Sequence, residues 1–224
     1  MRYSTVLFDL DGTLVDSSPG ILASNVYAAK KLGIPPITEA QIPRIMGPSL
    51  LDNARDYYHL EGARAQQFVA AIREQYDTEG VYMCRIYPGI PRLLEELQTA
   101  GIKTAVCTMK NEEQAVVGLR HFGLARHLDL ICGIDDDHPT EKWQTIDRCL
   151  ALLDVTDRRE VALVGDTLLD AQAAHRSHLD FVAATYGFGF RNSELSRAQA
   201  VYAATSAQEL SRFFLNIPLA QKGG

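Results

Sequence analysis

Short apolar runs alternate with helix-like segments through most of the chain after residue 88. Each run has four to six residues, the length of a buried strand, and is followed by a segment with apolar residues every three or four positions. A first strand at Val6-Leu7-Phe8 completes the pattern. The alternation predicts an α/β fold, a Rossmann-like parallel sheet with helices on both faces. The expected strands are 102–107, 128–132, 160–165 and 181–184, and the expected helices are about 89–100, 112–121 and 142–153, with another helix after 165.

The residues between about 15 and 84 have a different pattern, without a convincing strand. Asp16-Ser17-Ser18-Pro19 combines capping side chains with a proline, which predicts the start of a helix that stops at Gly33. Further helical patterns lie around 39–45, 49–59 and 62–79. The chain is therefore expected to have three parts: an α/β core domain formed by 1–15 and 85–215, an inserted all-helical cap domain formed by 16–84, and a flexible tail at 216–224.

Two acidic residues, Asp9 and Asp11, directly follow the first strand. Residues i and i+2 of a strand point to the same side, so the two carboxylates are expected to share one side of the chain. Gly12 then permits a sharp turn. Carboxylates at the end of a buried strand are costly unless something cationic meets them. The pattern therefore indicates a divalent metal, a phosphoryl group, or both.

Three further fragments place polar residues at the ends of later elements. Thr108 ends the second apolar run, Lys142 stands near the start of a helix pattern, and Asp166 ends the Gly-Asp strand, with Asp170 four residues on. The carboxyl ends of parallel strands meet in one crevice, where ligands of such sheets bind. Taken in order, the four fragments resemble the four motifs of the haloacid dehalogenase (HAD) superfamily, over roughly residues 3 to 190.

This resemblance implies an enzyme that forms an aspartyl-phosphate. Asp9 would be the nucleophile, and Asp11 the general acid and later the base that activates water. A Mg²⁺ ion would be bound by the Asp9 carboxylate, the Asp11 backbone carbonyl and Asp166, which suits a cation that favours hard oxygen ligands.

The resemblance also implies how the phosphate is held. Thr108 would hydrogen-bond it, the backbone N–H of Met109 would help, and Lys142 would neutralise charge between the nucleophile and the phosphoryl group. Lys110 is a second candidate cation. Asp170, the second acid of the last motif, would orient waters or the lysine from the second coordination shell, or alternatively balance charge in the first turn of its helix.

Composition narrows the setting of this chemistry. The net charge is −6 and no Lys/Arg run occurs, which disfavours nucleic-acid binding. No signal peptide and no stretch long enough to cross a membrane is apparent, so a cytoplasmic protein, monomeric or homodimeric, is expected. The four cysteines form no CxxC pair and are expected to be buried, reduced thiols; they are Cys84, Cys107, Cys132 and Cys149.

Several relatives within the superfamily fit less well. Haloacid dehalogenases lack the second acid of the first motif, whereas this chain has Asp11 there, so dehalogenation is disfavoured. β-Phosphoglucomutases carry a cap histidine at the position of Ile21, so a mutase fits poorly. The absence of membrane spans excludes P-type ATPases. Lys30 and Lys31 leave a phosphonoacetaldehyde hydrolase as a minor alternative, and a non-catalytic binding protein with the same fold is a further one.

The remaining possibility is a phosphatase for a small phosphorylated metabolite. Residues 9–17 resemble the phosphoglycolate phosphatase group, and residues 133–150 look closer to its 5′-nucleotidase-like members, although the proline that often follows the motif lysine is Trp143 here. Cap residues would select the substrate, with Arg44 and the loop Gly47-Pro48-Ser49 as candidates. The acidic stretch 135–137 is expected to be a solvated loop, and Tyr186 and Phe188 to lie in a loop near the crevice edge.

Overall fold

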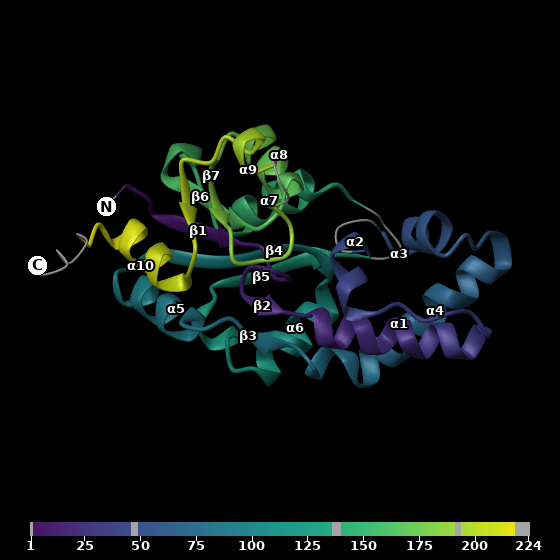
Figure 1. Cartoon of the computed structure of the whole chain (residues 1–224). Coiled ribbons are helices and arrows are strands. Elements are labelled where there is room, and N and C mark those ends of the chain that lie inside the picture. The colour runs from purple at the N-terminus through teal and green to yellow at the C-terminus, as the bar shows by residue number, and fades with distance from the viewer. Residues whose placement is uncertain (1, 46–48, 136–139, 191–193, 218–224) are drawn as a thin grey trace, which may run out of the picture. The chain divides into compact units, whose positions relative to one another are not determined.

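A parallel sheet forms the centre of the larger part of the chain. The structure, a computed structural model, describes residues 2–45, 49–135, 140–190 and 194–217. Within these residues six strands pair in parallel in the order β5-β4-β1-β6-β7-β8 (Figure 1). Their bounds are Thr5–Phe8 (β1), Lys103–Asn111 (β4), Leu130–Ile134 (β5), Val161–Gly165 (β6), Asp180–Ala184 (β7) and Tyr202–Ala204 (β8). The order places β1 at the centre of the sheet, next to β4 and β6.

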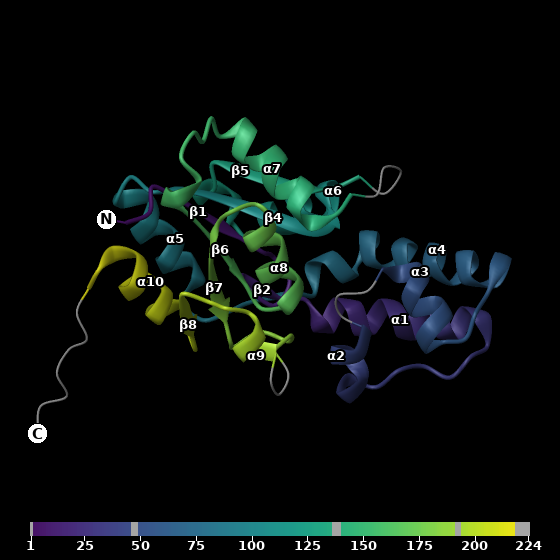
Figure 2. The ribbon, with the colours of Figure 1, turned by 90° about the horizontal axis from the view of Figure 1, so that it is seen from above.

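Helices cover both faces of this sheet, as the alternation predicted. In Figure 1, α7 and α8 lie above the sheet and α5, α6 and α10 below it; Figure 2 shows α7 and α8 from above. Buried Leu7, Leu163 and Phe181 form part of the apolar cluster beneath α7 and α8. The bounds are Ile90–Thr99 (α5), Glu112–His121 (α6), Lys142–Leu152 (α7), Leu168–Arg176 (α8), Glu194–Arg197 (α9) and Ala207–Leu215 (α10), with single 3₁₀ turns at Ala125–His127 and Arg158–Glu160.

The contacts within the chain divide it into two compact units. One is Asp16–Arg85, and the other joins Met1–Val15 to Ile86–Gly224. The first unit is helical, with a core that includes Ala29 and Phe68. Its elements are α1 (Ser18–Leu32), α2 (Ile42–Ile45), α3 (Leu50–Asp52), α4 (Gly62–Thr78), 3₁₀ turns at Glu39–Gln41 and Gly80–Tyr82, and a π-helical turn at Asn53–Tyr57. Two-residue strands, β2 (Val15–Asp16) and β3 (Arg85–Ile86), pair with each other.

Several elements differ from the sequence prediction. The strand predicted at 102–107 continues to Asn111, because Asn111 pairs with Ile134 beyond an irregularity in the ladder. The strand predicted at 128–132 begins two residues later, and β2, β3, α9, β8 and α10 were not predicted. A strand of two or three residues is too short for the period-2 alternation that identifies strands in a sequence.

The two predicted ends of the first helix, and the predicted start of the tail, can be compared with the structure. Gly33, in the left-handed region with a φ of +67°, ends α1 as expected. Ser17 occupies the N-cap position, but its side chain makes no capping bond; Asp16 accepts the Ser18 N–H at 3.0 Å instead. Asn216, in the predicted tail, still caps α10, and residues 218–224 lie outside the described residues.

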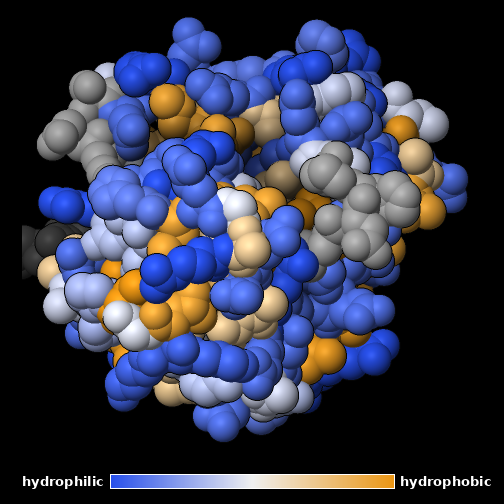
Figure 3. All heavy atoms as spheres, turned by 90° about the vertical axis from the view of Figure 1, so that its right-hand side faces the viewer, coloured by the Kyte–Doolittle hydropathy of each residue, from blue (hydrophilic) through white to orange (hydrophobic). Residues whose placement is uncertain are grey.

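The cysteine prediction is confirmed for Cys107, Cys132 and Cys149, which are buried free thiols, whereas Cys84 is only half-buried. In the described part of the chain, no helix is both long and apolar enough to cross a membrane. The face drawn in Figure 3 is mostly hydrophilic, with hydrophobic residues in small groups between polar ones.

Candidate active site

The centre of the candidate site is the chain just after β1. The N–H of Asp9 donates to the Val164 carbonyl at 2.8 Å, which continues the pairing of β1 with β6 and fixes the Asp9 backbone. Gly12 then turns the chain with a φ of +84°. Asp9 is buried, whereas the side chain of Asp11 keeps 20% of its exposure. The backbone thus places the Asp9 carboxylate inside the protein and the Asp11 carboxylate closer to the surface.

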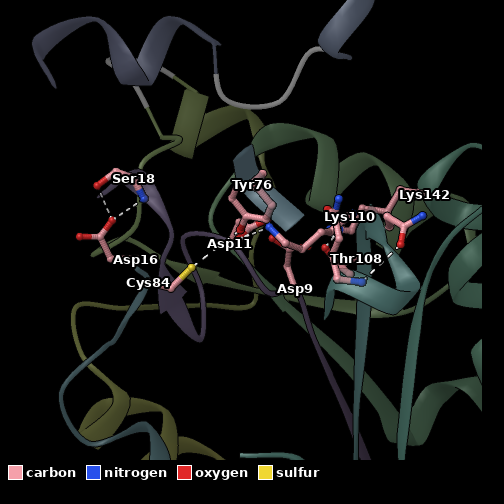
Figure 4. A network of polar contacts seen from close by, with 11 residues as sticks. Asp9, Asp11, Asp16, Ser18, Tyr76, Cys84, Thr108, Lys110 and Lys142 are labelled. Atoms are coloured by element: carbon pink, nitrogen blue, oxygen red, sulfur yellow. Dashed lines mark hydrogen bonds and ion pairs between the residues drawn. The ribbon is translucent and has the colours of Figure 1, made fainter. Parts of the chain in front are cut away.

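Lys142, the first residue of α7, reaches the Asp9 carboxylate. Its Nζ lies 2.5 Å from Asp9 Oδ1 and also pairs with Asp170 Oδ1 (Figure 4 shows Lys142 beside Asp9). Burial lowers the pKa of Lys142, but Asp170 and Asp9 together raise it well above its usual range. The other oxygen of Asp170 accepts hydrogen bonds from the N–H and the hydroxyl of Thr167. Thr167 therefore fixes the Asp170 carboxylate that binds Lys142. The ammonium therefore stays charged and aimed at Asp9.

Asp166 supplies the third carboxylate, at the end of β6. Its Oδ2 accepts the Phe188 N–H at 2.7 Å, whereas its buried Oδ1 has no hydrogen-bond partner among the described residues. Burial raises the pKa of Asp166 to about 8, with further contributions from Asp170 and Asp9. Burial likewise raises the pKa of Asp9 to about 7, although Lys142 opposes the shift. The positive charge of Lys142 therefore does not offset the cost of burying the negative charges of Asp9 and Asp166.

The donor set fits a magnesium ion. Asp9, Asp166 and Asp170 each offer a carboxylate oxygen, and these atoms lie within 4.8 Å of one another. Hard oxygen ligands of this kind are what Mg²⁺ favours. Because the Asp170 oxygens already bind Lys142 and Thr167, the carboxylate groups best placed to hold the cation are those of Asp9 and Asp166, whose Oδ1 has no partner in the described part of the chain.

The loop after β7 fixes Asp166 from the other side, a role that the sequence analysis missed. A Cβ on Gly187 would lie 2.2 Å from the Gly12 carbonyl oxygen and 2.4 Å from Asp166 Cβ, so the backbone can approach only as glycine. Tyr186 donates its hydroxyl to the Thr13 carbonyl at 2.8 Å, which ties the same loop to the chain after β1. The alternation of glycine and aromatic residues directly after a strand is the signal that could have identified this contact.

The end of β4 carries the residues predicted to bind phosphate. Thr108 is buried, and its hydroxyl accepts the Lys110 N–H at 3.1 Å. Met109 is 40% exposed. The Lys110 ammonium lies 3.1 and 3.3 Å from the two carboxylate oxygens of Asp11 (Figure 4). The end of β4 thus lies beside the carboxylates that follow β1, and Lys110 forms an ion pair with Asp11.

The cap candidates lie elsewhere in the chain. Arg44 is exposed on α2, in the unit Asp16–Arg85, and its role stays a prediction. Gly47 and Pro48 lie outside the described residues, as do two of the three acidic residues predicted to form a solvated loop, 136 and 137.

A surface cluster supports the turn that carries Lys142. Trp143 donates its indole N–H to Glu141, and Arg176 of α8 donates to the same carboxylate at 2.8 Å. The Arg176 guanidinium also stacks over the Trp143 ring, 4.1 Å from its centroid, a cation–π contact. The cluster joins the first turn of α7 to the last turn of α8 and so supports the start of the helix that carries Lys142.

The buried carboxylates make stability depend on pH in a defined direction. The folded, metal-free chain holds the Asp9 and Asp166 protons up to about pH 7 and 8, whereas the unfolded chain releases them near pH 4. The unfolded chain binds fewer protons in between, so the free energy of unfolding falls as the pH rises through this range. We expect the Tm of the metal-free protein, measured by calorimetry, to fall between pH 5 and pH 8.

Asp166→Asn is the control for that measurement, because it removes one of the two protons held by the folded chain. The fall in Tm with pH should be shallower in this variant, and Mg²⁺ should raise the wild-type Tm more at pH 8 than at pH 5. Equal slopes for wild type and variant would contradict the assignment to Asp166.

Comparisons with known proteins agree with this geometry. Residues 6–184 match the family model described as haloacid dehalogenase-like hydrolase. A 5′-nucleotidase from Pseudomonas aeruginosa is 32% identical over 92% of the chain and 94% of its own length. A phosphoglycolate phosphatase from Aquifex aeolicus is 30% identical over 85% of the chain and 88% of its own length.

A solved structure extends the likeness to the fold. A putative phosphatase from Clostridium difficile superposes with a TM-score of 0.88 at 30% identity, over 95% of this chain and 99% of the other. The ends of the parallel strands bring these carboxylates and lysines together, and the relatives match the chain over nearly its whole length. The chain therefore belongs to the haloacid dehalogenase-like hydrolases and is a phosphatase of that family.

Proposed function

We propose that the protein is a Mg²⁺-dependent phosphomonoesterase that works through an aspartyl-phosphate on Asp9. The observation that carries the proposal is the buried Asp9 carboxylate, held by Lys142 and close to the Asp166 carboxylate, whose Oδ1 has no hydrogen-bond partner among the described residues. When bound, Mg²⁺ would neutralise charge on the phosphoryl group and orient its oxygens. A phosphate ester docked there would meet a nucleophile whose position is already fixed.

The residues divide the reaction between them. Asp9 attacks phosphorus as the ester oxygen leaves with a proton from Asp11, and water then attacks the aspartyl-phosphate while Asp11 takes a proton back. Thr108 and the Met109 N–H hold the phosphoryl oxygens. Lys142 balances the charge that gathers between the phosphoryl group and Asp9.

The unit Asp16–Arg85 is proposed as the cap domain that selects the substrate. Such a domain would exclude water from the reaction and contact the leaving group. Arg44 is its candidate for a substrate carboxylate or second phosphate, because a guanidinium binds either group in a bidentate manner. The enzyme is proposed to act in the cytoplasm, as a monomer or homodimer.

The proposed substrate is a small phosphorylated metabolite of the phosphoglycolate type, and nucleoside 5′-monophosphates are the second candidate. The two relatives described above, a phosphoglycolate phosphatase and a 5′-nucleotidase, support one class each. Values of kcat/KM for phosphoglycolate, nucleoside monophosphates and sugar phosphates would separate the classes, because specificity is a ratio of these values. Arg44→Ala should lower kcat/KM for the preferred substrate and leave p-nitrophenyl phosphate nearly unaffected.

Metal removal tests the mechanism. Dialysis against EDTA is expected to abolish hydrolysis of p-nitrophenyl phosphate, and added Mg²⁺ should restore it while Ca²⁺ should not, because Ca²⁺ takes more ligands at longer distances. The measurement is the initial rate of p-nitrophenol release. Full activity in the presence of EDTA would contradict a metal-dependent reaction.

A further inference from the structure

We propose that Lys110 is a positioning residue for Asp11, holding its carboxyl group in place to give a proton to the leaving oxygen and to take one back from water. The inference rests on the proposed function, in which Asp11 is the general acid. It also revises the prediction that Lys110 binds phosphate. Two features support the inference: the contact between the two side chains and the way the backbone places Lys110.

The contact restricts the Asp11 carboxylate. The Lys110 Nζ lies 3.1 Å from Asp11 Oδ2 and 3.3 Å from Oδ1, so the ammonium faces both oxygens at once. Only 10% of the Lys110 side chain and 20% of the Asp11 side chain are exposed. A partly buried ion pair that engages both oxygens limits rotation of the carboxyl group, whereas a solvated pair would not.

An irregularity in the sheet places Lys110. Cys107 pairs with Cys132 and Asn111 with Ile134, so three residues of β4 stand opposite one residue of β5, which is Gly133. Bulges of this kind bend a strand and change the direction of its side chains. With regular pairing, the side chains after Cys107 would simply alternate between the two faces of the sheet. Thr108 and Lys110 stand two positions apart and would share one face in a regular strand as well; the extra residues bend the strand at the point where these two side chains leave it.

Gly133 makes this irregularity possible, and its neighbours lock it. A Cβ on Gly133 would lie 2.5 Å from the Lys110 carbonyl oxygen. The Gly133 N–H donates to Glu112 at 3.1 Å, and Arg148 binds both the Gly133 carbonyl at 2.7 Å and Glu112 at 2.6 Å. Lys110 therefore extends from a backbone that is fixed on the side facing β5.

The division of labour follows from the pairing. Lys142 contacts the nucleophile Asp9, and Lys110 contacts the acid Asp11. In the first step the Asp9–phosphorus bond forms, the bond from phosphorus to the ester oxygen breaks, and the Asp11 proton goes to that oxygen. The carboxylate left on Asp11 then faces the Lys110 ammonium. In the second step a water oxygen bonds to phosphorus, the Asp9–phosphorus bond breaks, and the water proton returns to Asp11.

A comparison of leaving groups tests the proposal. Phenyl phosphate and p-nitrophenyl phosphate share one phosphoryl group and one ring, but phenolate is the more basic leaving group and depends more on a proton donor. We expect Lys110→Met to lower kcat/KM for phenyl phosphate by about 100-fold, the scale of general acid catalysis, and for p-nitrophenyl phosphate by less than about 3-fold. Lys110→Arg should recover much of the loss.

Three further measurements exclude other roles for Lys110. The inhibition constant of inorganic phosphate should stay within about 2-fold of wild type, which a phosphate-binding residue would not allow. In an Asp11→Asn background, Lys110→Met should cause no additional loss on phenyl phosphate. Lys103→Met is the matched control: Lys103 lies at the opposite end of β4, donates to the Leu153 carbonyl, and should leave the ratio of the two substrates unchanged.

Gly133→Ala provides a second variant if Lys110→Met folds poorly, because it displaces the Lys110 backbone without removing a charge. The same preferential loss on phenyl phosphate is expected. Equal losses on both esters, weaker inhibition by phosphate, or no loss would each overturn the proposal. A wild-type protein inactive on every ester would instead contradict the proposed function, and the role of Asp11 with it.

Discussion

Asp9→Asn is expected to abolish phosphatase activity and to leave the folded protein at least as stable as wild type. The amide cannot attack phosphorus, so kcat should fall by about 10⁴-fold or more, the scale seen when a nucleophile is removed. Its oxygen can still accept from Lys142, which also keeps Asp170 as a partner. Burial disfavours the charge on Asp9, so a neutral amide relieves a cost in the metal-free protein.

Three measurements check this expectation. Steady-state hydrolysis gives the loss of kcat, calorimetry gives the Tm, and acid quenching of the enzyme with labelled substrate shows whether a phosphoenzyme forms. Asp180→Asn is the control, because Asp180 opens β7 at the opposite end of the sheet and binds Arg2 and Tyr3. It should form the phosphoenzyme normally. A labelled Asp9→Asn protein would show that the nucleophile lies elsewhere.

Gly12→Ala is expected to damage both metal binding and stability. The φ of +84° costs a residue with a Cβ about 1–2 kcal/mol. The added Cβ would also lie 2.2 Å from Asp166 Oδ2, which is held by the Phe188 N–H and buried at the end of β6. The Asp166 carboxylate must therefore move, and the apparent affinity for Mg²⁺ should fall by about 10- to 100-fold, as when the support of a metal ligand is lost.

Gly101→Ala separates the two causes. Gly101 has a φ of +74°, but nothing lies within 4 Å of the Cβ it would carry. Its substitution should lower the Tm through backbone strain alone and leave the Mg²⁺ dependence of activity unchanged. A titration of initial rate against Mg²⁺ for both variants makes the comparison. If Gly12→Ala bound Mg²⁺ as wild type does, Asp166 would not be the constrained ligand described here.

The sequence predicted the positions at strand ends better than the contacts between them. Asp9 and Asp166 follow apolar runs that are strands, and parallel pairing brings such ends to one edge. Lys142 was expected at a helix start and is the first residue of α7. These positions depend on hydrophobic patterns and on the order of the chain, which a sequence carries directly.

The contacts that were missed depend on backbone approach and on register. The Phe188 N–H that binds Asp166 is a main-chain group, so no side chain in the sequence marks it. The ion pair of Lys110 with Asp11 was not predicted either, and it forms where three residues of β4 stand opposite Gly133. A hydrophobic pattern predicts that two strands pair and does not predict an irregularity of two residues between them.

The cluster beside Lys142 gives the protein an optical consequence. The chain has one tryptophan, Trp143, and its ring lies under the Arg176 guanidinium and donates to Glu141. All indole emission therefore originates one residue from the lysine that contacts Asp9. Any ligand that moves the first turn of α7 changes the surroundings of a single fluorophore, so binding at the carboxylates can be followed without a label and without turnover.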